Sequence, residues 1–431
     1  MEKIKLKLES IFRGLTSTKK RRIAFFLAIS LLSALVVIGK RMDVVTNPQF
    51  YAEDGTFWYS EAYNLGPANS LLIPKQGYFQ TISRLGAIAS QFVGLANAPL
   101  VMNLIAIFIQ LLPIIFLLSS RFNKVIPRYP IRLLIIIAYL LLPHAGETHA
   151  NLTNAQWRLA ILMLLVIIAE NPKTLAWKFF DAISLLISGL SGPFSILMLP
   201  IFAVYEYFSK KKRYFYLLII FGTAAIQITS SVLTLKGQRS QVLLGASLPS
   251  FFKIASGNIF IASLIGSDFF GSVRHLPLWE NGFLPIFIGV LGITIFALVF
   301  WKSSKEMRLF LVFSLTIFTV ALITPQVSAK KPQWDLMIKG AGGRYYLLPS
   351  LAWIVSLGYL LFKANNKIIK YFSLALLLIF LFVGSPRDFF NEKFKDFKFR
   401  QQVSEFEKVP SGTNFEFKIY PKGWRMNLVK K

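Results

Sequence analysis

Long apolar runs separated by short polar and charged segments dominate the pattern of this 431-residue chain. Five runs, at 23–39, 100–119, 214–235, 283–301 and 309–324, approach the roughly 20 residues that an α-helix needs to cross a bilayer. The pattern predicts an all-α, polytopic integral membrane protein with about 11 transmembrane helices. The predicted spans are 23–39, 99–119, 131–143, 157–169, 179–190, 194–208, 214–235, 283–301, 307–324, 345–362 and 369–384.

The composition fits a chain whose solvent is the bilayer. Hydrophobic residues make up 55% of the sequence and charged residues 16%, against roughly 25% charged residues in soluble domains. The chain contains no cysteine. Disulfides, thiolate nucleophiles and cysteine-based zinc sites are therefore excluded.

Positive charge predicts the orientation. The net charge is +28, but the basic residues lie between the apolar runs and form no single stripe, which argues against nucleic-acid binding. Residues 1–22 carry eight cations and are predicted to be cytoplasmic, followed by a signal anchor without a cleavage site. A transmembrane domain at 23–384 then lies in the plasma (inner) membrane, and the polar C-terminal tail, 385–431, is predicted to be extracytoplasmic.

One apolar stretch, 179–208, is too long for a single comfortable span, since 30 helical residues extend about 45 Å. A break at Ser191-Gly192-Pro193 makes two short helices and keeps the basic cluster 210–213 on the cytoplasmic side. The charge pattern therefore favours a helical hairpin over one long span.

The segments predicted to face outward hold most of the polar chemistry. The first outer loop, 40–83, is expected to carry interfacial helices at 57–63 and 78–92. Further outer segments are predicted at 144–156, at 325–344, and at 236–282, where residues around 249–260 form an amphipathic segment.

The acidic pair Glu53-Asp54 lies in the first outer loop, among aromatic residues. Burial near the interface raises the proton affinity of a carboxylate, which suits a general base. In the alternative reading, Asp54 only caps the helix that begins near Thr56.

Outward-facing cations are candidates for binding a phosphate, for which the planar arginine fork is well suited. Each of them can instead extend its side chain to lipid headgroups. The candidates are Arg84, Arg158, Arg274, Lys339 and Arg344.

The loop from His144 to His149 brings two histidines close to Glu147. These side chains can contact a sugar or hold a divalent cation, the one cofactor that the sequence leaves open. The spacing differs from the His-Glu-x-x-His helix of zinc peptidases, and a plain polar turn explains the loop equally well.

The order of several short motifs resembles the GT-C superfamily, the polytopic membrane glycosyltransferases that use polyprenyl-phosphate sugars. The resemblance covers most of 20–365, but SGLSGP lacks the lysine of the family's corresponding hairpin motif. The motifs are AEDG at 52–55, PKQGY at 74–78, SRL at 83–85, GLANAP at 94–99, SGLSGP at 188–193 and GRYYLLP at 343–349.

This resemblance implies a membrane glycosyltransferase with an undecaprenyl- or dolichyl-phosphate sugar as donor. Asp54 matches the position of the catalytic base, with Glu53 in support, and Tyr78 lies in a motif expected to contact substrate. The implied reaction is an inverting displacement onto a glycan, lipid or protein acceptor of the cell envelope, among the membrane lipids at the outer face.

Two other functions stay open: a surface-polysaccharide polymerase or ligase, and a flippase or transporter of lipid-linked sugars. Polymerases and ligases usually rely on a late outer loop, whereas here the acids lie in the first one. Transport favours charged residues within spans, and only Asp181 and Glu206 border spans on the cytoplasmic side.

Overall fold

The computed structural model describes residues 12, 14–15, 17–234, 240 and 242–431. Four cations of the predicted cytoplasmic segment, Lys3, Lys5, Lys7 and Arg13, lie outside the described residues, as does the start of the predicted outer segment at 236.

The protein is a multi-pass helical membrane protein. Within the described part of the chain, eight helices are long and apolar enough to cross a membrane. Four further helices are shorter: α8 (Tyr129–Leu141), α9 (Ala155–Ile168), α10 (Leu175–Gly189) and α11 (Phe194–Ser209). The eight are α2 (Lys19–Lys40), Leu95–Leu118 including α7 (Ala98–Leu118), α12 (Tyr214–Thr234), Leu248–Ile265, α17 (Phe283–Lys302), α18 (Lys305–Ile323), α20 (Gly343–Lys363) and Lys367–Arg387 including α21 (Lys367–Ile379) and α22 (Ser385–Arg387).

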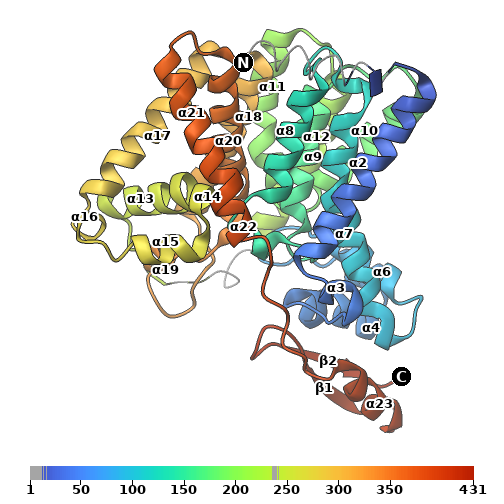
Figure 1. Cartoon of the computed structure of the whole chain (residues 1–431). Coiled ribbons are helices and arrows are strands. Elements are labelled where there is room, and N and C mark those ends of the chain that lie inside the picture. Colours follow the sequence, from blue (N-terminus) through green and yellow to red (C-terminus); the bar gives the residue numbers. More distant parts are fainter. Residues whose placement is uncertain (1–11, 13, 16, 235–239, 241) are drawn as a thin grey trace.

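Successive helices reverse direction, so that the connecting segments gather at two ends of the bundle (Figure 1). The upper end, here the Arg121 end, holds the turns 119–128, 169–174, 210–213, 303–304 and 364–366. Contacts join these turns: the Lys305 ammonium donates to the carbonyl of Phe208 over 2.6 Å. The basic turns predicted to share one side therefore lie together, while the membrane face they occupy stays a prediction.

The predicted break in 179–208 is confirmed. α10 ends at Gly189 and α11 begins at Phe194. Gly192 adopts a φ of 91°, and its backbone N–H donates to the carbonyl of Phe79 over 2.9 Å. A side chain at this position would be strained, because glycine alone adopts such a φ freely.

The lower end, here the Asp54 end, is built from the first loop and several short helices. The helices predicted at 57–63 and 78–92 exist, as parts of a longer set. The set is α3 (Asp43–Thr46), the π-helical turn η1 (Asp54–Tyr59), α4 (Ser60–Leu65), α5 (Pro67–Leu71) and α6 (Thr81–Ser90), with α15 (Ser267–Val273), α16 (Pro277–Glu280) and α19 (Gln333–Ile338) on the other side of the bundle.

The segment predicted to be amphipathic at 249–260 is longer and more deeply packed than expected. α13 (Leu248–Ile254), a π-helical turn (Ala255–Ile261) and α14 (Ala262–Ile265) form one continuous helix, which runs crosswise to α20 in Figure 1. Its polar side chains bond to the backbone of neighbouring segments: Ser256 donates to Pro285 and the Asn258 amide to Met337. The polar side chains Ser256 and Asn258 in the second half of this segment are thus buried.

The tail at 385–431 is a folded unit, which corrects the all-α prediction in a small part of the chain. α23 (Phe399–Lys408) packs on an antiparallel hairpin of β1 (Asn414–Lys418) and β2 (Arg425–Val429). The hairpin region binds the first loop, because Ala52 N–H donates to Tyr420 and the Thr56 hydroxyl to Arg425, each over 2.6 Å.

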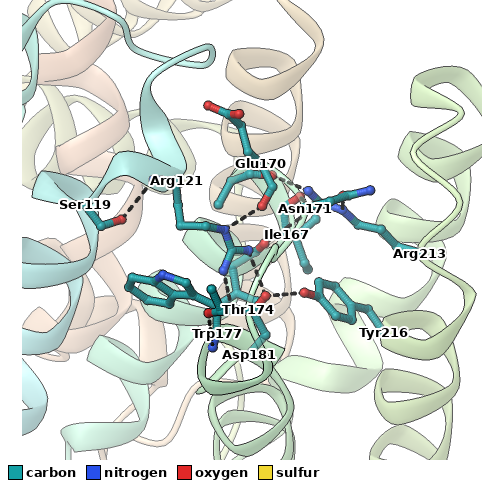
Figure 2. Close-up of polar contacts among 12 residues, drawn as sticks. Ser119, Arg121, Ile167, Glu170, Asn171, Thr174, Trp177, Asp181, Arg213 and Tyr216 are labelled. Carbon is teal, nitrogen blue, oxygen red and sulfur yellow. Dashed lines mark hydrogen bonds and ion pairs between the residues drawn. The ribbon is translucent and has the colours of Figure 1, made fainter. Parts of the chain in front are cut away.

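Buried charges connect the helices at the Arg121 end (Figure 2). Arg121 makes two hydrogen bonds to Asp181, over 3.1 and 2.7 Å, and Tyr216 donates to the same carboxylate. Glu206 accepts from the backbone of Arg213 over 2.7 Å. Both acids considered for transport therefore have structural partners.

Candidate functional site

A cavity of about 510 Å³ opens at the Asp54 end, here called the Glu53 cavity. Polar side chains from the first loop, the 144–156 loop and the start of α20 contribute to its lining. Apolar side chains of α11 and α18 contribute to it as well. The polar lining includes Glu53, Lys75, Gln80, Glu147, Asn154, Gln156 and Arg344, and the apolar lining includes Phe194, Ile196, Leu197, Ile317, Val320 and Ala321.

The two members of the acidic pair have different surroundings. Glu53 is partly exposed and lines the cavity. Asp54 is 1% exposed and does not line it. Its carboxylate accepts hydrogen bonds from the Thr153 N–H and hydroxyl, both over 2.8 Å, and from the Leu152 N–H over 3.2 Å. Asp54 therefore connects the first loop to the 144–156 loop.

Burial affects the proton affinity of both carboxyls. It raises the pKa of Asp54 to about 7, against the opposing effect of hydrogen bonds from Thr153 and Leu152. It also raises the pKa of Glu53, an increase that the positive charge of Arg344 opposes and the negative charge of Glu147 reinforces. Glu53 thus combines access to the cavity with a raised pKa, as a general base requires.

Arg344 and Glu147 form an ion pair in the lining of the cavity. The Glu147 carboxylate accepts from the Arg344 backbone N–H over 3.0 Å and forms an ion pair with its guanidinium. The guanidinium also donates to the carbonyl of Gln326 over 2.7 Å. These bonds fix the orientation of Arg344, which lines the cavity, while its binding of a phosphate stays a prediction.

Arg84 does not line the Glu53 cavity, and its role as a phosphate ligand stays a prediction. It is fully buried, its guanidinium lies 2.8 Å from Glu61, and it packs against the ring of Trp58. Lys75 lines the cavity instead, with its ammonium 3.4 Å from Glu61 and 3.8 Å from the ring centre of Phe57. The sequence signal for Lys75 was its place in the PKQGY motif beside Tyr78, which also lines the cavity.

The remaining predicted ligands lie in two other cavities. Arg158 and His149 line a cavity of about 460 Å³, here called the Lys40 cavity. Arg274 and Lys339 line an open hollow of about 620 Å³, in which the Arg274 guanidinium donates to the Lys339 carbonyl. His144 borders both of these cavities. The structure therefore does not bring these five residues to the Glu53 cavity.

The two histidines of the 144–149 loop interact with different neighbours. His144 Nε2 lies 3.1 Å from the carbonyl of Gly340, and His149 Nδ1 lies 3.4 Å from the amide nitrogen of Gln110. Burial lowers the pKa of both, well below the ordinary value for His149. Across the described residues, no three His, Asp or Glu side chains are grouped as metal ligands would be.

Comparison with protein-family models, curated proteins and solved structures found no match to this chain. The resemblance to GT-C glycosyltransferases stays a prediction from short motifs.

Proposed function

We propose that the protein is a membrane glycosyltransferase that moves a sugar from a polyprenyl-phosphate donor to a cell-envelope acceptor, a glycan, lipid or protein. The observation that carries this proposal is the lining of the Glu53 cavity, which divides by element: charged side chains come from the first loop, the 144–156 loop and α20, and apolar side chains come from α11 and α18. A substrate with a polar head and a hydrocarbon tail matches that division.

The apolar part accommodates the lipid. Ile196 and Leu197 on α11 line the cavity together with Val320 and Ala321 on α18, and both helices are apolar. A polyprenyl chain between such helices exchanges bilayer contacts for protein contacts at little cost, because both surroundings are apolar. The head group then lies among Glu53, Lys75 and Arg344.

In the proposed reaction Glu53 accepts the proton of the acceptor hydroxyl while that oxygen attacks the anomeric carbon. The bond from this carbon to the phosphate oxygen breaks, and its electron pair leaves with the phosphate. Lys75 and Arg344 stabilise the negative charge that develops there. This assignment exchanges the roles predicted for the acidic pair, since Asp54 is buried and its carboxylate is occupied by Thr153 and Leu152.

The test measures transfer of labelled sugar from a panel of polyprenyl-phosphate sugars by purified protein in lipid nanodiscs. Glu53→Gln removes the base and keeps the size of the side chain, so we expect transfer to fall about 100-fold or more. Glu405→Gln, on the exposed face of α23, is the matched control and retains wild-type transfer. Wild-type transfer by Glu53→Gln would refute the role of Glu53, and inactivity of the wild type with the whole panel would refute the reaction.

A further inference from the structure

The Lys40 cavity shares no lining residue with the Glu53 cavity. It lies between the last residue of α2, the 144–149 loop, α9 and the segment 387–392. Its volume of about 460 Å³ exceeds what a single halide ion needs. It is therefore a separate place where a ligand can bind.

Two buried cations line this cavity. Lys40 is 7% exposed and Arg158 is 2% exposed. One guanidinium nitrogen of Arg158, Nη2, donates to the Thr148 hydroxyl over 3.0 Å, and the guanidinium packs on the ring of Tyr139. Within the described chain, its Nε and Nη1 have no hydrogen-bond partner, and neither cation lies within ion-pair distance of a carboxylate. Buried charges of this kind are costly unless an anion compensates them.

The carboxylates of the cavity compensate this positive charge only in part, since Asp388 attracts Lys40 from beyond ion-pair distance. Asp388 accepts hydrogen bonds from the His144 N–H and from the N–H and hydroxyl of Ser267, over 2.8 to 3.1 Å. Asp268 and Glu392 are exposed at the rim, as is Arg387. The buried end thus holds two cations, while the exposed charges lie in water, where they are screened.

The neighbouring histidine responds to the same charges. Burial lowers the pKa of His149 well below its ordinary value, and the positive charges of Arg41, Lys40 and Arg158 lower it further. His149 and Arg158 both line the cavity. The electrostatic potential at the buried end therefore favours an anion.

We propose that the Lys40 cavity binds a phosphate group, through the Arg158 guanidinium and the Lys40 ammonium. Arg158 Nε and Nη1 carry N–H donors without a partner, and each can donate to an oxygen of a phosphate. Two sources share this chemistry. A lipid headgroup can enter from the membrane, since Lys40 ends a candidate span and Phe390 at the rim is 76% exposed. A soluble phosphate can enter from water. The site does not depend on sugar transfer in the Glu53 cavity.

The experiment measures thermal unfolding of the purified full chain in a phosphate-free zwitterionic detergent at constant ionic strength. One arm titrates inorganic phosphate against chloride, and the other titrates short-chain phosphatidic acid against the uncharged diacylglycerol with the same chains. The variants are Arg158→Met and Lys40→Met, each of which keeps the apolar stem and removes the charge. Arg400→Gln, exposed on α23, is the control.

We expect a ligand-dependent rise in the unfolding temperature of the wild type and of Arg400→Gln, with affinity reduced about 10-fold or more in both methionine variants. A response to inorganic phosphate identifies a soluble anion, and a response only to phosphatidic acid identifies a lipid headgroup. If Arg158→Met does not fold, the ligand affinity of Lys40→Met tests the proposal. Equal responses in wild type and variants, or none in either arm, would overturn the proposal.

Discussion

Thr153 donates two hydrogen bonds to one oxygen of the Asp54 carboxylate, from its backbone N–H and from its hydroxyl, each over 2.8 Å. The neighbouring Glu53 lines the cavity instead. Two adjacent carboxylates therefore have separate tasks: Asp54 joins two loops, and Glu53 is available to a substrate.

The burial of Asp54 predicts a pH-dependent stability. Because burial raises its pKa from 3.8 to about 7, the folded state binds a proton between these values that the unfolded state releases. This contribution is fully present below about pH 4 and is lost as the pH rises through 7. Asp54→Asn removes the titration, so the free energy of unfolding of the wild type should fall relative to the variant by up to about 1.4 kcal/mol per pH unit.

Denaturant unfolding in detergent at pH 5, 6, 7 and 8 measures this difference. Burial lowers the pKa values of His144 and His149, so these residues change the stability with pH in the opposite direction. Their contribution cancels when the free energy of unfolding of the variant is subtracted from that of the wild type. Parallel stability curves for the two proteins would contradict the raised pKa of Asp54.

Arg344 is predicted to set the pH range in which Glu53 acts as a base. Its positive charge opposes the increase in the pKa of Glu53, while Glu147 reinforces it. Arg344→Gln removes the opposing charge, so the pKa of Glu53 should rise. The acidic limb of the pH–rate profile of sugar transfer should then move to higher pH.

The control is Arg344→Lys, which keeps the charge and loses the fork that holds Glu147 and Gln326. The acidic limb of the pH–rate profile of Arg344→Lys should stay at nearly the same pH as that of the wild type, even if the maximal rate of the variant is lower. An unshifted limb in Arg344→Gln would mean that Glu53 is not the group whose ionisation limits transfer.

The Arg121–Asp181 pair is predicted to stabilise the bundle. Asp181→Leu leaves the guanidinium of Arg121 buried without its carboxylate and removes the acceptor of Tyr216, so the free energy of unfolding should fall by about 3 to 5 kcal/mol. Thermal or denaturant unfolding measures the loss. The double variant Arg121→Met/Asp181→Leu has no unpaired charge and should recover a large part of it. A double variant as unstable as the sum of both single ones would argue against coupling between the two residues.

The apolar runs by themselves determined that the chain is a multi-pass helical membrane protein. A bilayer offers no water to hydrogen-bond with backbone N–H and C=O groups. A long apolar run therefore forms a helix, in which these groups bond to one another within the segment. Ser191-Gly192-Pro193 and the basic cluster after it were sufficient to divide 179–208 into two helices. The hairpin of the tail was not predicted, because NFEFK and RMNLV are too short to stand out from a polar segment.

For the acidic pair, the sequence determined only that two carboxylates follow the first span. The tertiary structure decided which of them lines a cavity, because Thr153, 99 positions away in sequence, donates a hydrogen bond to the Asp54 carboxylate. It likewise directed Arg84 to Glu61, paired Arg344 with Glu147, and placed Arg158 in a different cavity. The physical reason is that the partner of a charged side chain depends on the packing of segments distant in sequence, which a local pattern does not contain.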